Sequence, residues 1–163
     1  MTIVAREMLD LISHNVEQTQ RLGARLGSLL TAGDVIALQG ELGSGKTNFV
    51  KGIARGLAIR GTVHSPTFIL ANEYRGGRLP LFHVDAYRVG DAAEALGFGF
   101  DDYLNDAGVT VIEWAERIRD ALPTEHLWIE FRYISETKRA ILMQARGSHY
   151  QQLVDELKQQ AFK

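Results

Sequence analysis

The segment from Gly40 to Thr47 constrains the fold of this chain more than any other part of its sequence. It reads Gly-Glu-Leu-Gly-Ser-Gly-Lys-Thr and matches the pattern G-x-x-x-x-G-K-[ST] at every fixed position. The apolar run at residues 35–38 precedes it, as expected of a strand that is buried on both faces. Apolar residues then recur at helical spacing, at Phe49, Val50, Ile53, Ala54 and Leu57. A strand, a glycine-rich loop and a helix in this order predict a phosphate-binding loop.

Each fixed residue type of this loop has a chemical role. Glycines permit positive φ and let backbone N–H groups approach phosphate oxygens. The N-terminus of the following helix adds unpaired N–H groups and the positive end of its dipole. Lys46 supplies a mobile positive charge for the β- and γ-phosphates, and Thr47 offers its hydroxyl to Mg²⁺. No Asn-Lys-x-Asp element that would read guanine occurs, so the sequence favours ATP as the nucleotide.

The rest of the chain predicts strands and helices around this loop. Strand-like runs cover residues 8–13, 68–74, 78–85, 109–112, 127–134 and 139–145. The pair Gly76-Gly77 predicts a tight hairpin between two of these runs, and residues 135–137 predict a second hairpin. A helix with Asn15 as its N-cap is expected to end near Gly33, with Gln18 reaching back to the cap. Two more helical stretches cover residues 92–96 and 150–157.

These elements predict an α/β fold. We expect a P-loop NTPase-like three-layer arrangement with a mixed, mainly parallel central sheet and helices on both faces. No internal repeat or linker divides the chain, so we expect residues 1–163 to form a single nucleotide-binding domain.

Composition excludes several classes of function. The chain has no cysteine, which rules out disulfides, thiolate metal sites and a cysteine nucleophile. Its net charge is −2, and a protein that binds long nucleic acids by itself usually carries a basic excess. No apolar run approaches the roughly 18 residues that a membrane span needs. We therefore expect a cytoplasmic protein without a membrane or a direct nucleic-acid partner.

Two carboxylates stand where apolar strands end. Asp85 follows Leu-Phe-His-Val, and Glu113 follows Val-Thr-Val-Ile. Ligands of open α/β sheets collect at the carboxyl ends of strands, so both acids are expected near the loop. One would hold Mg²⁺ and the other would polarise the attacking water, and the spacing leaves open which does which. Thr67, in Ser-Pro-Thr-Phe, is a candidate sensor of the γ-phosphate or Mg²⁺. His83 shares a strand face with Asp85, and we assign it a packing role.

Several segments together resemble one family over nearly the whole chain. They are the phosphate loop, Ser65-Pro66-Thr67-Phe68 with Asn72-Glu73-Tyr74 behind it, His83-Val84-Asp85-Ala86-Tyr87-Arg88, and Val111-Ile112-Glu113-Trp114. In order and spacing these segments resemble the TsaE (YjeE) family of bacterial tRNA threonylcarbamoyladenosine biosynthesis ATPases. The resemblance implies a weak ATPase that works with a TsaB–TsaD-type pair, which transfers a threonylcarbamoyl group to an adenosine beside the tRNA anticodon. ATP turnover would reset that complex, and tRNA would be contacted only through it.

The resemblance also assigns roles to residues of this chain. Those expected at the nucleotide are Gly43, Ser44, Gly45, Lys46, Thr47 and Asn48. Those expected to be catalytic are Lys46, Thr67, Asp85 and Glu113. Those expected at Mg²⁺ are Thr47, Asp85 and Glu113, and Trp114 is expected beside the site. The chain departs from the family at three positions, where Ser44, Asn48 and Ala86 replace a common alanine, threonine and leucine.

Two other functions remain open from the residues. One is a small P-loop kinase that passes the γ-phosphate to a metabolite, although its arginines at 132, 139 and 146 lie mainly on a predicted hairpin and suit a lid poorly. The other is a nucleotide-gated binding module without useful turnover.

Overall fold

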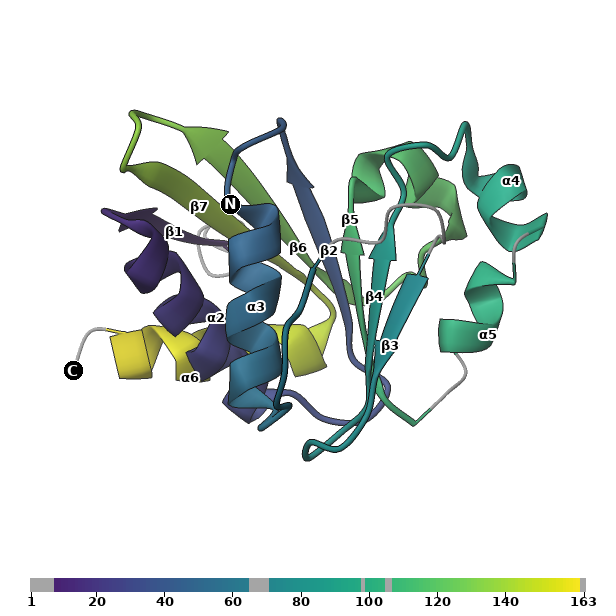
Figure 1. Ribbon diagram of the computed structural model, residues 1–163, viewed down its shortest axis with the longest axis horizontal. Helices are drawn as coiled ribbons and strands as arrows, with labels where there is room; N and C mark the ends of the chain where they lie inside the picture. The colour runs from purple at the N-terminus through teal and green to yellow at the C-terminus, as the bar shows by residue number, and fades with distance from the viewer. Residues whose placement is uncertain (1–7, 65–70, 98, 105–106, 162–163) are drawn as a thin grey trace.

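One sheet of seven strands forms the centre of the computed structural model, which describes residues 8–64, 71–97, 99–104 and 107–161 (Figure 1). Its strand order is β1-β7-β6-β2-β5-β4-β3. In chain order the strands are β1 (Met8–Ser13), β2 (Val35–Gly40), β3 (Ala71–Tyr74), β4 (Leu81–Asp85), β5 (Val109–Glu113), β6 (His126–Tyr133) and β7 (Arg139–Arg146).

The pairing of these strands confirms the mixed, mainly parallel sheet. β2 pairs in parallel with both β5 and β6, and β4 pairs in parallel with β5. β7 is antiparallel to its neighbours β6 and β1, and β3 is antiparallel to β4. All strands except β7 and β3 therefore run in one direction. The carboxyl ends of β2, β4 and β5 meet at one edge of the sheet, where ligands of such folds bind.

Helices cover both faces of the sheet, as predicted (Figure 1). One face packs against α2 (Val16–Leu29), α3 (Lys46–Gly56) and α6 (Ser148–Ala161). The other packs against α4 (Ala92–Gly97), α5 (Phe100–Leu104) and the 3₁₀ helix η1 (Ala115–Ala121). The sequence did not predict α5 or η1. No helix in the described part of the chain combines the length and the apolar content that crossing a bilayer requires.

The start of α2 follows the prediction with one change. Asn15 Oδ1 accepts a hydrogen bond from Gln18 N at 2.7 Å, so Asn15 is the N-cap. Gln18 Oε1 accepts from His14 N at 2.8 Å, and thus reaches one residue further back than the cap that we predicted. This cap fixes the first turn of α2, which borders the pocket described below.

The hairpin between β3 and β4 is looser than the Gly76-Gly77 pair predicted. Tyr74 pairs with Leu81, so residues 75–80 form the connection. Gly76 has a φ of 101°, whereas Gly77 is not in the left-handed region. A Cβ at Gly77 would lie 2.3 Å from Leu57 O, and Arg78 N donates to the same oxygen at 2.6 Å. Gly77 therefore serves a close approach to the end of α3 and not a tight turn. The predicted strand residues 68–70 lie outside the described residues.

Four glycines bring α2 and α3 into close contact. They are Gly23 and Gly27 on α2, and Gly52 and Gly56 on α3. A Cβ at any of them would lie 2.0–2.4 Å from a backbone oxygen of the facing helix. Backbone atoms cannot turn aside as the end of a flexible side chain can, so the helices would have to separate. Because α3 begins at Lys46, this packing also fixes the distance between the phosphate loop and the first turn of α2.

We expect Gly52→Ala to lower the free energy of unfolding by about 1–3 kcal/mol, because the added methyl group overpacks the helix pair. Its Cβ would lie 2.0 Å from Gln20 O. Gly97→Ala is the matched control, since nothing lies within 4 Å of a Cβ at this helical position. Urea unfolding of both variants measures the effect. Equal midpoints for the two variants would contradict close packing of α2 on α3.

Candidate nucleotide-binding site

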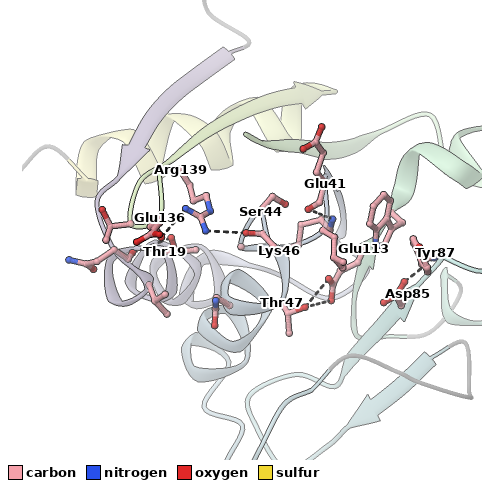
Figure 2. Close-up of a pocket in the computed structure, with 18 residues that line it drawn as sticks. Thr19, Glu41, Ser44, Lys46, Thr47, Asp85, Tyr87, Glu113, Glu136 and Arg139 are labelled. Carbon is pink, nitrogen blue, oxygen red and sulfur yellow. Dashed lines mark hydrogen bonds between the residues drawn. The ribbon is translucent and has the colours of Figure 1, made fainter. Parts of the chain in front are cut away.

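A pocket of about 320 Å³ lies at the carboxyl ends of β2, β4 and β5 (Figure 2). The phosphate loop forms its floor, the first turn of α2 and the β6–β7 connection form one side, and the ends of β4 and β5 form the other. Its lining residues are Asn15, Val16, Thr19, Glu41, Leu42, Gly43, Ser44, Gly45, Lys46, Thr47, Asn48, Asp85, Tyr87, Glu113, Trp114, Glu136, Thr137 and Arg139. The pocket thus gathers every predicted nucleotide, metal and catalytic residue except Thr67, which lies outside the described residues.

The phosphate loop has the predicted strand–loop–helix context. β2 ends at Gly40 and α3 begins at Lys46. Gly43 has a φ of 77° and Gly45 a φ of 104°, values that favour glycine because other residues meet steric strain there. Gly45 is the N-cap of α3 and provides no side-chain hydrogen bond to it. The first N–H groups of α3 therefore face the pocket without a side-chain cap, an arrangement suited to an anion.

Lys46 lies within this loop and is only 5% exposed. Its Nζ donates to the carbonyl oxygens of Gly40 and Glu41. The ammonium also lies 3.9 Å from the ring centroid of Trp114. Burial lowers the pKa of Lys46, while the carboxylates of Glu113, Glu116 and Asp85 act to raise it. The loop therefore holds a partly desolvated cation, which interacts more strongly with a phosphate than an exposed one does.

Glu113 is the carboxylate that lies against Thr47. Thr47 Oγ1 donates toward Oε1 at 3.0 Å and toward Oε2 at 3.2 Å of Glu113 (Figure 2). Glu113 ends β5 and is 3% exposed. His83 Nε2 lies 2.5 Å from Oε2 of the same carboxylate. The structure thus joins the hydroxyl and one of the carboxylates that were predicted separately for Mg²⁺.

Asp85 lies at the end of β4, paired in register with Glu113. Its Oδ1 accepts a hydrogen bond from Tyr87 N at 2.9 Å. Burial raises the pKa of Asp85, the hydrogen bond from Tyr87 acts to lower it, and the charge of Glu113 acts to raise it further. The structure therefore brings both predicted acids to the pocket but gives them different surroundings.

The donor set at this end of the pocket suits Mg²⁺, which prefers oxygen ligands and keeps several waters when it binds with phosphates. A hydroxyl and two carboxylates converge here, from Thr47, Glu113 and Asp85. The described residues contain no group of three or more His, Asp or Glu side chains that could hold an ion by themselves. A metal here could take its remaining ligands from water and from the phosphates of a nucleotide.

The other end of the pocket contains residues that the sequence analysis did not predict. Thr19 comes from α2, Glu136 and Thr137 from the β6–β7 connection, and Arg139 from the start of β7. Arg139 Nη2 donates to Gly43 O at 3.1 Å and so ties the hairpin to the phosphate loop. The only signal for Glu136, Thr137 and Arg139 was the predicted hairpin, whose connection follows a strand parallel to β2 and thus reaches the same sheet edge.

Comparison with known proteins places the chain in a family. The family model described as threonylcarbamoyl adenosine biosynthesis protein TsaE matches residues 13–141. The chain belongs to the TsaE family. A protein of Bacillus subtilis named tRNA threonylcarbamoyladenosine biosynthesis protein TsaE is 42% identical, over 88% of this chain and 89% of the relative. A protein of the same name from Treponema pallidum is 41% identical, over 80% of this chain and 96% of the relative.

The fold agrees with that of a solved structure. The crystal structure of Bacillus subtilis YdiB superposes with a TM-score of 0.83 and 36% identity, over 94% of this chain and 96% of that one. The resemblance read from the sequence motifs and the expected fold are thereby both confirmed.

The three positions that the sequence resemblance set apart can be placed in the structure. Ser44 N donates to Glu41 O at 3.1 Å and its Oγ is buried. Asn48 lines the pocket, and its Oδ1 accepts from Gln20 Nε2 of α2 at 3.5 Å. Ala86 is buried in the core on the η1 side of the sheet. Ala86 N donates to the main-chain oxygen of Glu113 at 3.0 Å, so this position contacts the proposed acid through its backbone.

Trp114 lies beside the site, as the resemblance implied. Its φ is 59°, a left-handed value that strains a bulky residue. The indole contacts Tyr87 with ring centroids 4.9 Å apart and lies over Lys46. The sharp turn after Glu113 therefore brings an aromatic wall to the pocket beside the lysine.

Proposed function

We propose that this chain is the ATP-binding and ATP-hydrolysing component of the assembly that adds a threonylcarbamoyl group to the adenosine next to the anticodon of tRNA. Membership of the TsaE family supports the pathway, since relatives bear the name tRNA threonylcarbamoyladenosine biosynthesis protein TsaE. The observation that carries the ATPase part is the contact of Thr47 with Glu113 beside the phosphate loop. A phosphate cradle, an alcohol and a buried carboxylate in contact are the parts that phosphoryl transfer to water requires.

The phosphate loop and the two carboxylates at the strand ends have separate roles in this proposal. The backbone N–H groups of Gly43, Gly45 and the first turn of α3 bind the phosphates, and Lys46 Nζ stabilises charge on the β- and γ-phosphate oxygens. Thr47 and Glu113 hold the metal site. Mg²⁺, when bound, supplies further neutralisation of phosphate charge.

Asp85 is the residue that we assign to the attacking water. Burial raises its pKa, so this carboxylate is a better proton acceptor than an exposed aspartate. The water oxygen forms a bond to the γ-phosphorus while the bond from the γ-phosphorus to the β–γ bridging oxygen breaks, and the proton of the water passes to Asp85 and then to solvent. Thr67 stays a candidate for sensing the γ-phosphate.

The partner part of the proposal is a TsaB–TsaD-type pair, which carries the transfer chemistry while ATP turnover resets the complex between cycles. Exposed apolar side chains beside the phosphate loop support a protein partner, because such groups favour association. Leu42 at the loop is 86% exposed, and Tyr133 and Ile134 at the end of β6 are 56% and 48% exposed. The net charge of −2 supports contact with tRNA only through the complex. We infer a cytoplasmic location from this role.

ATP hydrolysis by the purified chain tests the proposal. Phosphate release is measured with and without Mg²⁺, with and without the TsaB–TsaD pair of the same organism, and with a Lys46→Ala preparation as background. We expect slow, Mg²⁺-dependent turnover that changes when the pair is added. Fast turnover that the pair does not change, or no turnover under any condition, would contradict the proposal. Transfer of phosphate to an added metabolite would identify a kinase instead.

The resetting role has its own readout, which is the number of tRNA molecules modified per TsaB–TsaD pair. We expect about one without this chain, and many when the chain and ATP are present. Repeated modification without ATP turnover would leave the chain as a nucleotide-gated binding module.

A further inference from the structure

His83 lies in the centre of β4 and is completely buried. Its Nε2 is 2.5 Å from Oε2 of Glu113, on the neighbouring strand β5. The sequence analysis gave this histidine a packing role. A polar side chain with no exposure that ends on the carboxylate beside the phosphate loop indicates more than packing, since burying such a group costs free energy unless it is hydrogen-bonded.

The contact requires a proton between the two atoms. A carboxylate oxygen and an unprotonated ring nitrogen are both acceptors, and at 2.5 Å their lone pairs would repel each other. A proton on Nε2 makes the contact a charge-assisted hydrogen bond to the carboxylate. Nδ1 is then the bare nitrogen, in accord with its lack of a hydrogen-bond partner among the described residues. His83 thus donates to Glu113 through Nε2.

This bond and the bond from Thr47 hold the carboxylate of Glu113 from two sides. Thr47 Oγ1 lies within 3.0–3.2 Å of the two carboxylate oxygens, and His83 occupies Oε2 from the sheet side. A glutamate side chain has several rotamers, and a metal ligand is effective when its rotamer is fixed before the metal arrives. The imidazole is suited to this task because β4 fixes its backbone and the core fixes its ring.

We propose that His83 is a positioning residue, which orients the carboxylate of Glu113 for Mg²⁺-dependent nucleotide binding and hydrolysis. This inference rests on the proposed function, in which Glu113 holds the metal site. Partners that hydrogen-bond a metal ligand from behind typically change metal affinity or activity about 10–100-fold when they are removed. His83 therefore acts through Glu113 and not on the nucleotide.

Two amide variants of equal chemistry and different reach test the inference. The amide nitrogen of His83→Gln reaches about as far as Nε2 and can donate to Glu113. The amide of His83→Asn is one methylene shorter and ends near the position of Nδ1. His83→Met fills similar volume and has no donor. Urea unfolding of each variant, with its midpoint compared with that of the wild type, separates loss of stability from loss of positioning.

The readout is calorimetric titration with ATP, first in EDTA and then at increasing Mg²⁺ concentration. The Mg²⁺ concentration at which ATP affinity reaches half of its Mg²⁺-dependent increase is the quantity compared. We expect His83→Asn and His83→Met to raise it about 10–100-fold. Their affinity for ATP in EDTA should stay within about threefold of the wild type, because the phosphate loop is untouched. His83→Gln should keep the Mg²⁺ dependence of the wild type.

Two results would overturn the inference. A normal Mg²⁺ dependence in the folded His83→Asn and His83→Met variants shows that the histidine only packs. The same conclusion follows if all three variants lose Mg²⁺ affinity in proportion to their lost stability. Positioning of Glu113 by a hydrogen bond requires that His83→Gln keep its Mg²⁺ affinity. The wild type distinguishes failure of this inference from failure of the proposed function. If wild-type ATP binding does not respond to Mg²⁺, the proposed function fails and this inference fails with it. If the wild type responds as expected but the variants do not show the changes expected of them, the inference alone fails.

Discussion

Replacing Lys46 by alanine is expected to abolish ATP hydrolysis and to weaken ATP binding by at least about 100-fold. Hydrogen bonds to charged groups contribute about 1.5–3 kcal/mol each, and Lys46 has one N–H left for a phosphate oxygen after donating to Gly40 O and Glu41 O. A loss of about 2.8 kcal/mol corresponds to a factor of about 100. The ammonium is 5% exposed at the loop, so the nucleotide does not need to desolvate it first. Calorimetric titration and phosphate release measure the two effects.

The fold should survive this substitution. Burial lowers the pKa of Lys46, which means that the charged form is disfavoured in the folded chain, so removing the charge does not remove a large stabilising term. Lys51→Ala is the matched control, because Lys51 lies on the exposed side of the same helix. We expect it to leave both binding and hydrolysis unchanged. Hydrolysis that persists in Lys46→Ala, at the rate of Lys51→Ala, would show that the phosphate loop does not bind the reacting nucleotide.

The parts of this fold that were predicted correctly are those determined by neighbours in the sequence. The phosphate loop needs glycines at fixed spacing, a strand before it and a helix after it, and all three are local features. Asn15 was recognised as a cap because its partner is three residues away. The β3–β4 connection was predicted wrongly because its shape depends on a distant group, the carbonyl of Leu57 at the end of α3.

Short elements without a strong local pattern were missed. α5 covers only Phe100–Leu104, and η1 begins after the strained backbone of Trp114. Neither has the repeated apolar spacing that marks a longer helix. Both pack on the second face of the sheet, where Phe100 and Ile118 are buried. Their helical form therefore depends on tertiary packing, which the sequence pattern does not display.

The candidate site was likewise predicted only in the parts that local sequence patterns determine. Asp85 and Glu113 were found because each ends an apolar strand, and strand ends meet at one edge of a parallel sheet. Their separate surroundings depend on strand register and on contacts across the sheet. Thr47 is 66 residues from Glu113, and Arg139 is 96 residues from the loop carbonyl that it binds. Such pairings follow from the order of strands in the sheet, which local patterns leave open.

Substitution of the two acids is expected to separate their roles. Glu113→Gln should lower the rate of ATP hydrolysis by at least about 100-fold and remove its normal Mg²⁺ dependence, because a neutral amide is a poor ligand for Mg²⁺. Glutamine keeps the shape of the side chain, and its oxygen can still accept a hydrogen bond from Thr47 or His83. ATP binding in EDTA should therefore stay close to that of the wild type.

Asp85→Asn should give a different pattern. Loss of a residue that accepts the proton of the attacking water lowers the rate by about 10²–10⁴-fold. The Mg²⁺ concentration for half-maximal ATP binding should change little, since Asp85 is held by Tyr87 N and Glu113 is the acid in contact with Thr47. Asparagine can accept the same hydrogen bond through its amide oxygen, so the local backbone should be preserved.

Comparing the Mg²⁺ titrations of these two variants decides between the assignments. If Asp85→Asn raises the Mg²⁺ requirement while Glu113→Gln does not, the roles of the acids are exchanged, and the contact between Thr47 and Glu113 has another purpose. The same variants test the purpose of hydrolysis. Glu113→Gln binds ATP without turnover in our account, so it should associate with the TsaB–TsaD pair but fail to support repeated tRNA modification. Repeated modification with this variant would show that nucleotide binding alone drives the cycle, because no ATP is hydrolysed to reset the complex.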